Sequence, residues 1–280
     1  MEIKNQINDL LSEFDQHNRI VSIGLQGGFA RGTAIQKTSD IDLIFVFEKS
    51  EDAKDILKGS FDYRGSKFEA RHLYLDKVNP NLWEPKIRYV YSDETLILRD
   101  NNKMLQNIIE MSKMTFDQQQ EITVYAIRKF GTRGITYKNV LYASWRGFYW
   151  GDPKDYWVVK GDLISAHLRL DECVTLLCSL IFALNLKFLP SSKWRYSIMQ
   201  NLNWLPNNFI FLLEQALTRS KFDMESFSRR EKAFQTLLEI CIEKADIEKI
   251  LPNNIGDFYK NKIQDFTDNT SDSRKIKIWK

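Results

Sequence analysis

A nearly continuous apolar run from Ile41 to Phe47 constrains the fold of this chain more than any other feature. A strand that is apolar on both faces is typical of a central strand covered by other elements on both sides. Asp40 and Asp42 lie at its start. Side chains alternate faces along a strand, so these two carboxylates point the same way while Ile41 and Leu43 point into the packed side. Two carboxylates placed in this way are suited to a hard divalent cation.

A glycine-rich turn precedes this strand in the sequence. Residues 19–25 are expected to form a first strand, which leads into Gly27-Gly28-Phe29-Ala30-Arg31-Gly32-Thr33. Glycines allow backbone N–H groups to come close to phosphate oxygens, and a helix that starts just after the turn directs its positive end at them. Arg31 adds a point or bidentate contact to a phosphate. We therefore expect a phosphate-binding loop beside the two carboxylates.

The first hundred residues mix helical and strand patterns, whereas helical patterns dominate after Asn101. An amphipathic helix is expected at 3–14, a further strand at 67–75 and a short edge strand at 96–98. The later helices are expected at 103–114, 117–130, 155–186, 191–204, 208–217 and 224–244. We predict an α+β fold, with an N-terminal α/β domain on a small mixed sheet (residues 1–110) and an all-helical C-terminal domain (residues 111–280).

Composition limits the partners that such a chain binds. The 40 basic and 37 acidic residues give a net charge of +3, and this near balance favours a small-molecule or protein partner over a nucleic acid. Three cysteines with no CxxC pair indicate buried free thiols. No apolar run approaches the roughly 20 residues that span a bilayer. We expect a cytoplasmic protein without a membrane partner, and the sequence leaves its oligomeric state open.

The turn and the carboxylates together resemble the signature of the DNA polymerase beta-like nucleotidyltransferase superfamily. In that family a strand, a Gly-Ser or Gly-Gly turn and a spacer precede Asp-x-Asp on the next strand, as Gly27-Gly28 precedes Asp40-Ile41-Asp42 here. Gly28 departs from the family, which often has a serine there whose hydroxyl binds a phosphate. The resemblance implies a nucleoside triphosphate co-substrate, two Mg²⁺ ions (or Mn²⁺), and transfer of a nucleoside monophosphate with loss of pyrophosphate, a reaction of EC 2.7.7 type.

The resemblance also implies roles for individual residues. Asp40, Asp42 and a third acid from a later strand would be catalytic and hold the metal, and Glu69 is our choice over Asp76 for this third acid. The expected nucleotide-binding residues of this half are Gly27, Gly28, Arg31, Thr33 and Ser39. Arg71 shares a strand face with Glu69, and it either neutralises a nucleotide phosphate or pairs with a carboxylate.

The second half resembles, more loosely, the helical domain of the aminoglycoside and lincosamide nucleotidyltransferases of bacteria. Lys160-Gly161-Asp162, Arg169-Leu170-Asp171-Glu172 and Lys193-Trp194 carry this resemblance. It implies that Lys160 and Lys193 bind the triphosphate and that Asp162 is a candidate general base. For each of these side chains the alternative is an ordinary structural or solvated charge.

Three functions follow as alternatives. The leading one is transfer of AMP from ATP to an acceptor hydroxyl on a small molecule or a protein. The second is a toxin–antitoxin or defence-type nucleotidyltransferase that acts on protein or tRNA. The third is a catalytically inactive relic that binds partners, and the presence of candidates for all three expected carboxylates argues against it.

Overall fold

The computed structural model describes residues 2–14, 19–34, 39–129, 136–137, 140–141, 157–158 and 160–253. Contacts within the chain divide it into two compact units, Met1–Lys113 and Met114–Lys280. The domain boundary expected after residue 110 lies near this division. Each unit has its own architecture and is described by itself.

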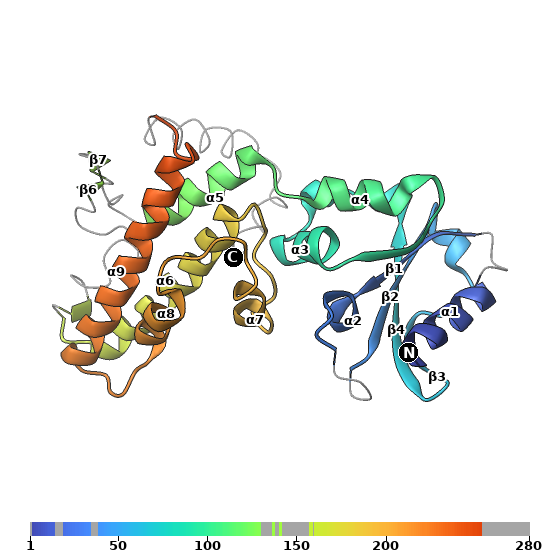
Figure 1. The fold of residues 1–280 in the computed structure, drawn as a ribbon, viewed down its shortest axis with the longest axis horizontal. Coiled ribbons are helices and arrows are strands. Elements are labelled where there is room, and N and C mark those ends of the chain that lie inside the picture. The colour runs from blue at the N-terminus through green and yellow to red at the C-terminus, as the bar shows by residue number, and fades with distance from the viewer. Residues whose placement is uncertain are drawn as a thin grey trace. The chain divides into compact units, whose positions relative to one another are not determined.

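The first unit is built on a five-stranded mixed sheet with the strand order β3-β4-β2-β1-β5 (Figure 1). The strands are β1 (Ile20–Gln26), β2 (Ile41–Phe47), β3 (Gly59–Tyr63), β4 (Ser66–Tyr74) and β5 (Leu96–Asp100). The apolar run forms β2, which lies in the middle of the sheet as predicted. It pairs antiparallel with β1 and parallel with β4, while β3 and β5 close the two edges in antiparallel pairing.

Helices cover both faces of this sheet. The α-helices of the unit are α1 (Glu2–Phe14), α2 (Gly27–Arg31), α3 (Pro85–Asp93) and α4 (Met104–Ser112), and the short 3-10 helices are η1 (Ser50–Ala53), η2 (Leu75–Lys77), η3 (Pro80–Leu82) and η4 (Asn101–Lys103). In Figure 1, α1 lies on one side of the sheet, while α3 and α4 lie on the other. A central strand between two helical layers must be apolar on both faces, which explains the continuous apolar run.

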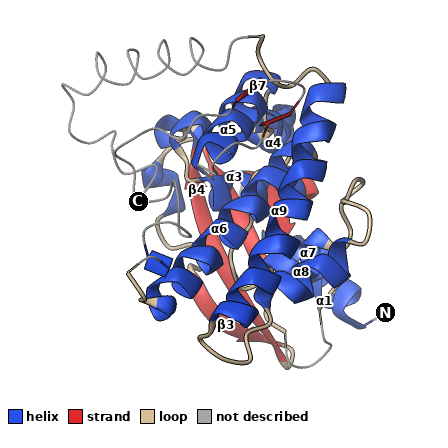
Figure 2. Cartoon of the chain, turned by 90° about the vertical axis from the view of Figure 1, so that its left-hand side faces the viewer, coloured by secondary structure: helices blue, strands red, loops and turns tan. Residues whose placement is uncertain are grey.

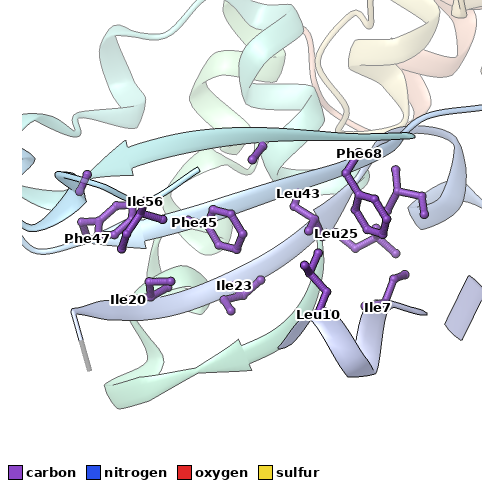
Figure 3. Close-up of a cluster of buried hydrophobic side chains, with 13 residues drawn as sticks. Ile7, Leu10, Ile20, Ile23, Leu25, Leu43, Phe45, Phe47, Ile56 and Phe68 are labelled. Carbon is purple, nitrogen blue, oxygen red and sulfur yellow. The ribbon is translucent and has the colours of Figure 1, made fainter. Parts of the chain in front are cut away.

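The alternation along β2 divides the core of this unit into two layers. Odd-numbered side chains such as Leu43 and Phe45 pack with Ile7 and Leu10 of α1 (Figure 3). Even-numbered side chains face the other layer, where Ile44 and Val46 pack with Leu105, Ile108 and Ile109 of α4. Full burial of each such side chain contributes about 1.5–3 kcal/mol. Asp42 has the parity of Ile44, so its carboxylate lies on the α3 and α4 side of the sheet.

The second unit is helical, which confirms the expected fold class. Its helices are α5 (Phe116–Lys129), α6 (Leu163–Leu184), α7 (Arg195–Met199), α8 (Phe209–Leu217) and α9 (Met224–Ile247). The long helix α9 packs against α6 and α8, and α5 packs against α6 (Figure 2). Among the described residues, the departure from an all-helical unit is a ladder of two-residue strands, β6 (Thr136–Tyr137) and β7 (Val140–Leu141).

Two predicted helices of this unit have the wrong bounds. Helix α6 begins at Leu163 rather than at residue 155, because Gly161 takes a positive φ of 75° and Asp162 caps the helix by accepting a hydrogen bond from Ser165 N at 2.9 Å. The helix expected at 191–204 is reduced to α7. Beyond it, the Asn185 side chain holds the backbone of Trp204 through two hydrogen bonds of 2.9 and 3.0 Å, which directs the chain back to the end of α6.

Strand β3 was not predicted from the sequence. It alternates half-buried and exposed residues at the edge of the sheet, so it lacks the apolar stripe that identifies a strand. The three cysteines are buried and free, as expected. Within the part of the chain that the structure describes, no helix combines the length and the apolar character that crossing a membrane requires.

Candidate active site

Three carboxylates lie near one another around the start of β2, on the α3 and α4 side of the sheet. In the parallel pairing of β2 with β4, Asp42 lies directly opposite Glu69, and Asp40 lies just before β2. Burial raises the pKa of Asp42; the Arg71 guanidinium opposes this shift, and the nearby carboxylates of Asp40 and Glu69 add to it. The alternative third acid, Asp76, lies in η2 beyond the end of β4. The register therefore places Glu69, rather than Asp76, beside Asp42.

Arg71 supplies positive charge to this group of acids. Its Nη2 lies 3.0 Å from Glu69 Oε1 and 3.4 Å from Asp42 Oδ1, and its side chain is half exposed. Residues 69 and 71 share a strand face, so the guanidinium folds back over the carboxylate two positions before it. Of the two uses expected for Arg71, pairing with carboxylates is the one that the structure shows.

Gly27 brings the turn into contact with the acids. It has a positive φ of 68°, and a Cβ built at this position would overlap Oδ2 of Asp42. A side chain at position 27 would therefore displace the carboxylate, and glycine is required for both reasons. At Gly28 the nearest atoms to such a Cβ belong to Ala34, at 3.4 Å, so the space at position 28 accommodates a small side chain.

The turn itself is closed by its own backbone. Thr33 N and Ala34 N both donate to the carbonyl of Gly28, at 2.9 and 3.0 Å, and Gly32 ends α2 in the left-handed conformation. Thr33 thus fixes the turn through its main chain, while its hydroxyl accepts a long hydrogen bond of 3.4 Å from Arg31 Nε. Ser39 is half-buried and stands just before Asp40.

Arg31, expected at a phosphate, is held by a carboxylate that sequence reasoning missed. Its Nη1 lies 2.6 Å from Oε2 of Glu94, and the two side chains are only 11% and 6% exposed. Burial raises the pKa of Glu94, and the Arg31 guanidinium opposes that shift. Removing one partner of a buried ion pair typically costs about 3–5 kcal/mol. The two residues are 63 positions apart, so no local pattern in the sequence links them.

A chain of two hydrogen bonds next to this ion pair also connects β1 with α3. Gln26, the residue before the turn, is the register partner of Asp42 on β1, and its Nε2 donates to Thr95 Oγ1 at 3.0 Å. The Thr95 hydroxyl in turn donates to the carbonyl of Val90 in α3, at 2.9 Å. The strand that carries the turn is thereby connected to the end of α3.

The candidate residues of the helical half belong to the second unit. Lys160 is exposed, and Lys193 is exposed with its ammonium 5.0 Å from the ring centroid of Trp194. Asp162 accepts hydrogen bonds from the backbone N and the hydroxyl of Ser165, which lower its pKa. A helix cap with a lowered pKa has the properties of a structural acid rather than those of a general base.

The first unit thus carries a glycine turn packed against the carboxylate of Asp42, with Glu69 opposite Asp42 on the neighbouring strand. Residues 5–113 match the family model of the nucleotidyltransferase domain, so the first unit is a domain of that kind. A solved structure described as a nucleotidyltransferase-like protein from Exiguobacterium sibiricum 255-15 shares 11% identity, with 87% of this chain and 76% of that chain covered and a TM-score of 0.43. Comparison with curated proteins gives no match.

Proposed function

We propose that this chain transfers a nucleoside monophosphate, AMP from ATP, to an acceptor hydroxyl on a small molecule or a protein. The observation that carries the proposal is the position of Asp42, opposite Glu69 in register and in contact with Gly27, inside a nucleotidyltransferase domain. A turn that holds phosphates and acids that hold their counter-ion are needed at one place for this reaction. Here the turn follows the end of β1, and Asp42 at the start of β2 lies beside it with Glu69 of β4 in register.

The donor set fits Mg²⁺, although within the described residues no three His, Cys, Asp or Glu side chains are arranged as a ready ligand group. Asp40, Asp42 and Glu69 offer oxygen ligands, which Mg²⁺ prefers. Each of the other two carboxylates raises the pKa of Asp42, which indicates negative charge that a cation would stabilise. When bound there, Mg²⁺ would neutralise triphosphate charge and favour displacement at the α-phosphorus.

The chain's own residues would then position the triphosphate. In the reaction the acceptor oxygen forms a bond to the α-phosphorus, and the bond from that phosphorus to the bridging oxygen of the β-phosphate breaks. Pyrophosphate leaves with that electron pair, and the proton of the acceptor hydroxyl passes to water. The backbone N–H groups of the turn from Gly27 would bind phosphate oxygens. Arg71, half exposed beside the acids, would offer positive charge to the phosphate oxygens as charge develops on them.

Calorimetry with a non-hydrolysable ATP analogue tests the site. We expect the double variant Asp40→Asn/Asp42→Asn to lose Mg²⁺-dependent binding by at least about tenfold, because two oxygen ligands lose their charge. Asp62→Asn, an exposed acid on edge strand β3, is the matched control and should bind as the wild type does. Unchanged affinity in the double variant, with a native circular dichroism spectrum, would contradict the proposal.

The acceptor is identified by incubating the protein and labelled ATP with a cell lysate. Label on a small molecule or a protein supports the proposal as stated, whereas label on RNA supports the defence-type alternative. If no pyrophosphate is released with any of the four nucleoside triphosphates and a broad set of acceptors, the inactive alternative is favoured. The same assay with Asp40→Asn/Asp42→Asn shows whether the label depends on the acidic site.

A further inference from the structure

We propose that Glu94 is a positioning residue of this site, which holds Arg31 and thereby fixes the Gly27–Arg31 turn against the acids. The inference rests on the proposed function, because its consequence is measured on a triphosphate. It assigns Arg31 to the turn, through Glu94, rather than to direct contact with a phosphate.

The geometry supports a tie at each end of the turn. Gln26 at its entry is bound by Thr95, and Arg31 at its exit is bound by Glu94, at 3.0 and 2.6 Å. Two consecutive residues therefore hold both ends of one five-residue helix. Between these ends, Gly27 packs directly on the carboxylate of Asp42.

Glu94 and Thr95, which hold the turn, are themselves fixed by α3 and β5. Glu94 is the C-cap of α3, and its backbone N donates to Val90 O at 3.0 Å. The Thr95 hydroxyl donates to the same carbonyl, at 2.9 Å. Directly after them β5 begins with Leu96, which pairs with Leu25 of β1. A displacement of the turn would have to break ties to a helix and a strand together.

The ion pair between Arg31 and Glu94 differs from an ordinary surface ion pair because both side chains are buried. Glu94 is 6% exposed and Arg31 11% exposed, so little water can replace either partner. By contrast, Glu84 at the other end of α3 pairs with Lys86 at 2.8 Å while both side chains are more than half exposed. Exposed pairs of this kind contribute little, which makes Glu84→Gln the matched control.

A double-mutant cycle measures the proposal. Glu94→Gln, Arg31→Gln and the combined variant are titrated with a non-hydrolysable ATP analogue and, separately, with Mn²⁺ alone. We expect each single variant to weaken triphosphate binding about tenfold, and the combined variant to lose no more than either single one, because all three break the same tie. Affinity for Mn²⁺ alone should stay within about twofold of the wild type, because the metal-binding acids are unchanged.

The opposite assignment gives the opposite result. If Arg31 acts by binding phosphate, Glu94→Gln releases it, and triphosphate affinity stays equal or becomes tighter. That outcome, or additive losses in the combined variant, overturns the proposal. Should Glu94→Gln fail to fold, Thr95→Val removes the tie at the other end of the turn, and it must weaken triphosphate binding by itself for the proposal to stand.

Hydrogen exchange separates this proposal from the proposed function. In Glu94→Gln the backbone amides of residues 28–33 should exchange faster than in the wild type, with no such change in Glu84→Gln. Unchanged exchange overturns the positioning role whether or not any nucleotide binds. A wild-type protein that binds no triphosphate overturns the proposed function instead, while the exchange result still decides whether Glu94 fixes the turn.

Discussion

Arg71 places a positive charge beside two of the carboxylates that are proposed to hold a metal ion. It contacts both Glu69 and Asp42, at 3.0 and 3.4 Å. Its charge opposes the rise in the pKa of Asp42 that burial causes. A fixed positive charge beside the acids opposes the arrival of a second cation. A divalent ion that binds these acids, as proposed, would have to displace or tolerate the guanidinium.

We expect Arg71→Gln to bind Mn²⁺ more tightly than the wild type. The gain should be roughly two- to fivefold, because an exposed ion pair contributes about 1 kcal/mol or less. Isothermal titration with Mn²⁺ in the absence of nucleotide measures it. Arg64→Gln, which removes the exposed pair with Asp9 in the same unit, should leave Mn²⁺ affinity unchanged. Equal or weaker Mn²⁺ binding in Arg71→Gln would show that the guanidinium does not compete.

For single residues, the sequence predicted the structure where the alternation of side chains along a strand decides which face a residue occupies. The alternation of strand side chains predicted that Asp42 would be on the face opposite Ile41, and the parity of the core confirms it. The partner of Arg31 was not predictable, because the contact with Glu94 depends on where α3 ends relative to the turn. Long-range ion pairs follow from tertiary packing and leave no spacing in the sequence.

Among the elements, α6, α8 and α9 are joined by a buried arginine. Arg230 of α9 is fully buried; its Nε donates to the carbonyl of Ala216 in α8 at 2.7 Å, and its Nη1 lies 2.7 Å from Nδ1 of His167 in α6. Its Nη2 pairs with Asp171 of α6. A guanidinium can only donate, so His167 Nδ1 must accept, and Nε2 carries the proton and donates to Asp223 O at 3.2 Å. The packing of three helices thus requires a neutral imidazole.

The stability of this helical unit should therefore fall in mild acid. Burial lowers the pKa of His167, and Arg230 beside it lowers the pKa further. The unfolded chain takes up a proton near pH 6.5, whereas the folded imidazole does so at lower pH, so stability is fully present above about pH 6.5 and decreases as the pH falls below it. Urea unfolding at pH 7.5 and pH 5.5 measures the change.

His167→Gln is the control for this titration. A glutamine amide can accept from Arg230 and donate to Asp223 O without changing charge. The pH dependence between 7.5 and 5.5 should be smaller in this variant than in the wild type. His72 in the first unit also has a pKa lowered by burial and contributes with the same sign, so the difference between the two proteins isolates His167. Equal slopes would contradict the role of the imidazole.

Element bounds were less predictable than element types. The apolar periodicity of the sequence extends over residues 155–186, yet α6 begins only at Leu163. Gly161 has a positive φ, and Asp162 caps the N-terminus of the helix. Helix α7 is short because the Asn185 side chain makes two hydrogen bonds to the backbone of Trp204, 19 residues further along the chain. Periodicity reports which face is buried, whereas caps and side-chain contacts with the backbone decide where the helix starts and stops.

On the scale of the whole molecule, the nucleotidyltransferase match and the first compact unit end at the same residue, Lys113. That unit has apolar layers on both faces of its sheet. The C-terminal end of its last helix, α4, is capped by a side chain of the same unit. Arg88 donates to the carbonyls of Met111, Ser112 and Lys113, at 3.2, 3.3 and 2.9 Å. These bonds satisfy carbonyls at the end of α4, where a helix otherwise lacks partners. A chain ending there retains the contacts that complete the domain.

We accordingly expect a fragment of residues 1–113 to fold by itself. It has the size of an ordinary domain. Trp83, its one tryptophan, packs against Tyr91 with ring centroids 4.5 Å apart, so its fluorescence reports on the core between the sheet, α3 and α4. Urea should unfold it in one cooperative transition by fluorescence and circular dichroism, with a slope of about 1–3 kcal/mol per molar urea. Transitions that differ between the two probes would contradict an independent domain.

The same fragment separates the contributions of the two units to binding. Asp40, Asp42 and Glu69 are retained in it, so its affinity for Mn²⁺ should equal that of the full chain within about twofold. Lys160 and Lys193 are lost with the second unit, so any loss of triphosphate affinity beyond this limit measures what that unit adds. Lys160→Gln and Lys193→Gln in the full chain then show whether the lysines account for the loss. A fragment that loses Mn²⁺ binding while it stays folded would place essential ligands outside the three acids.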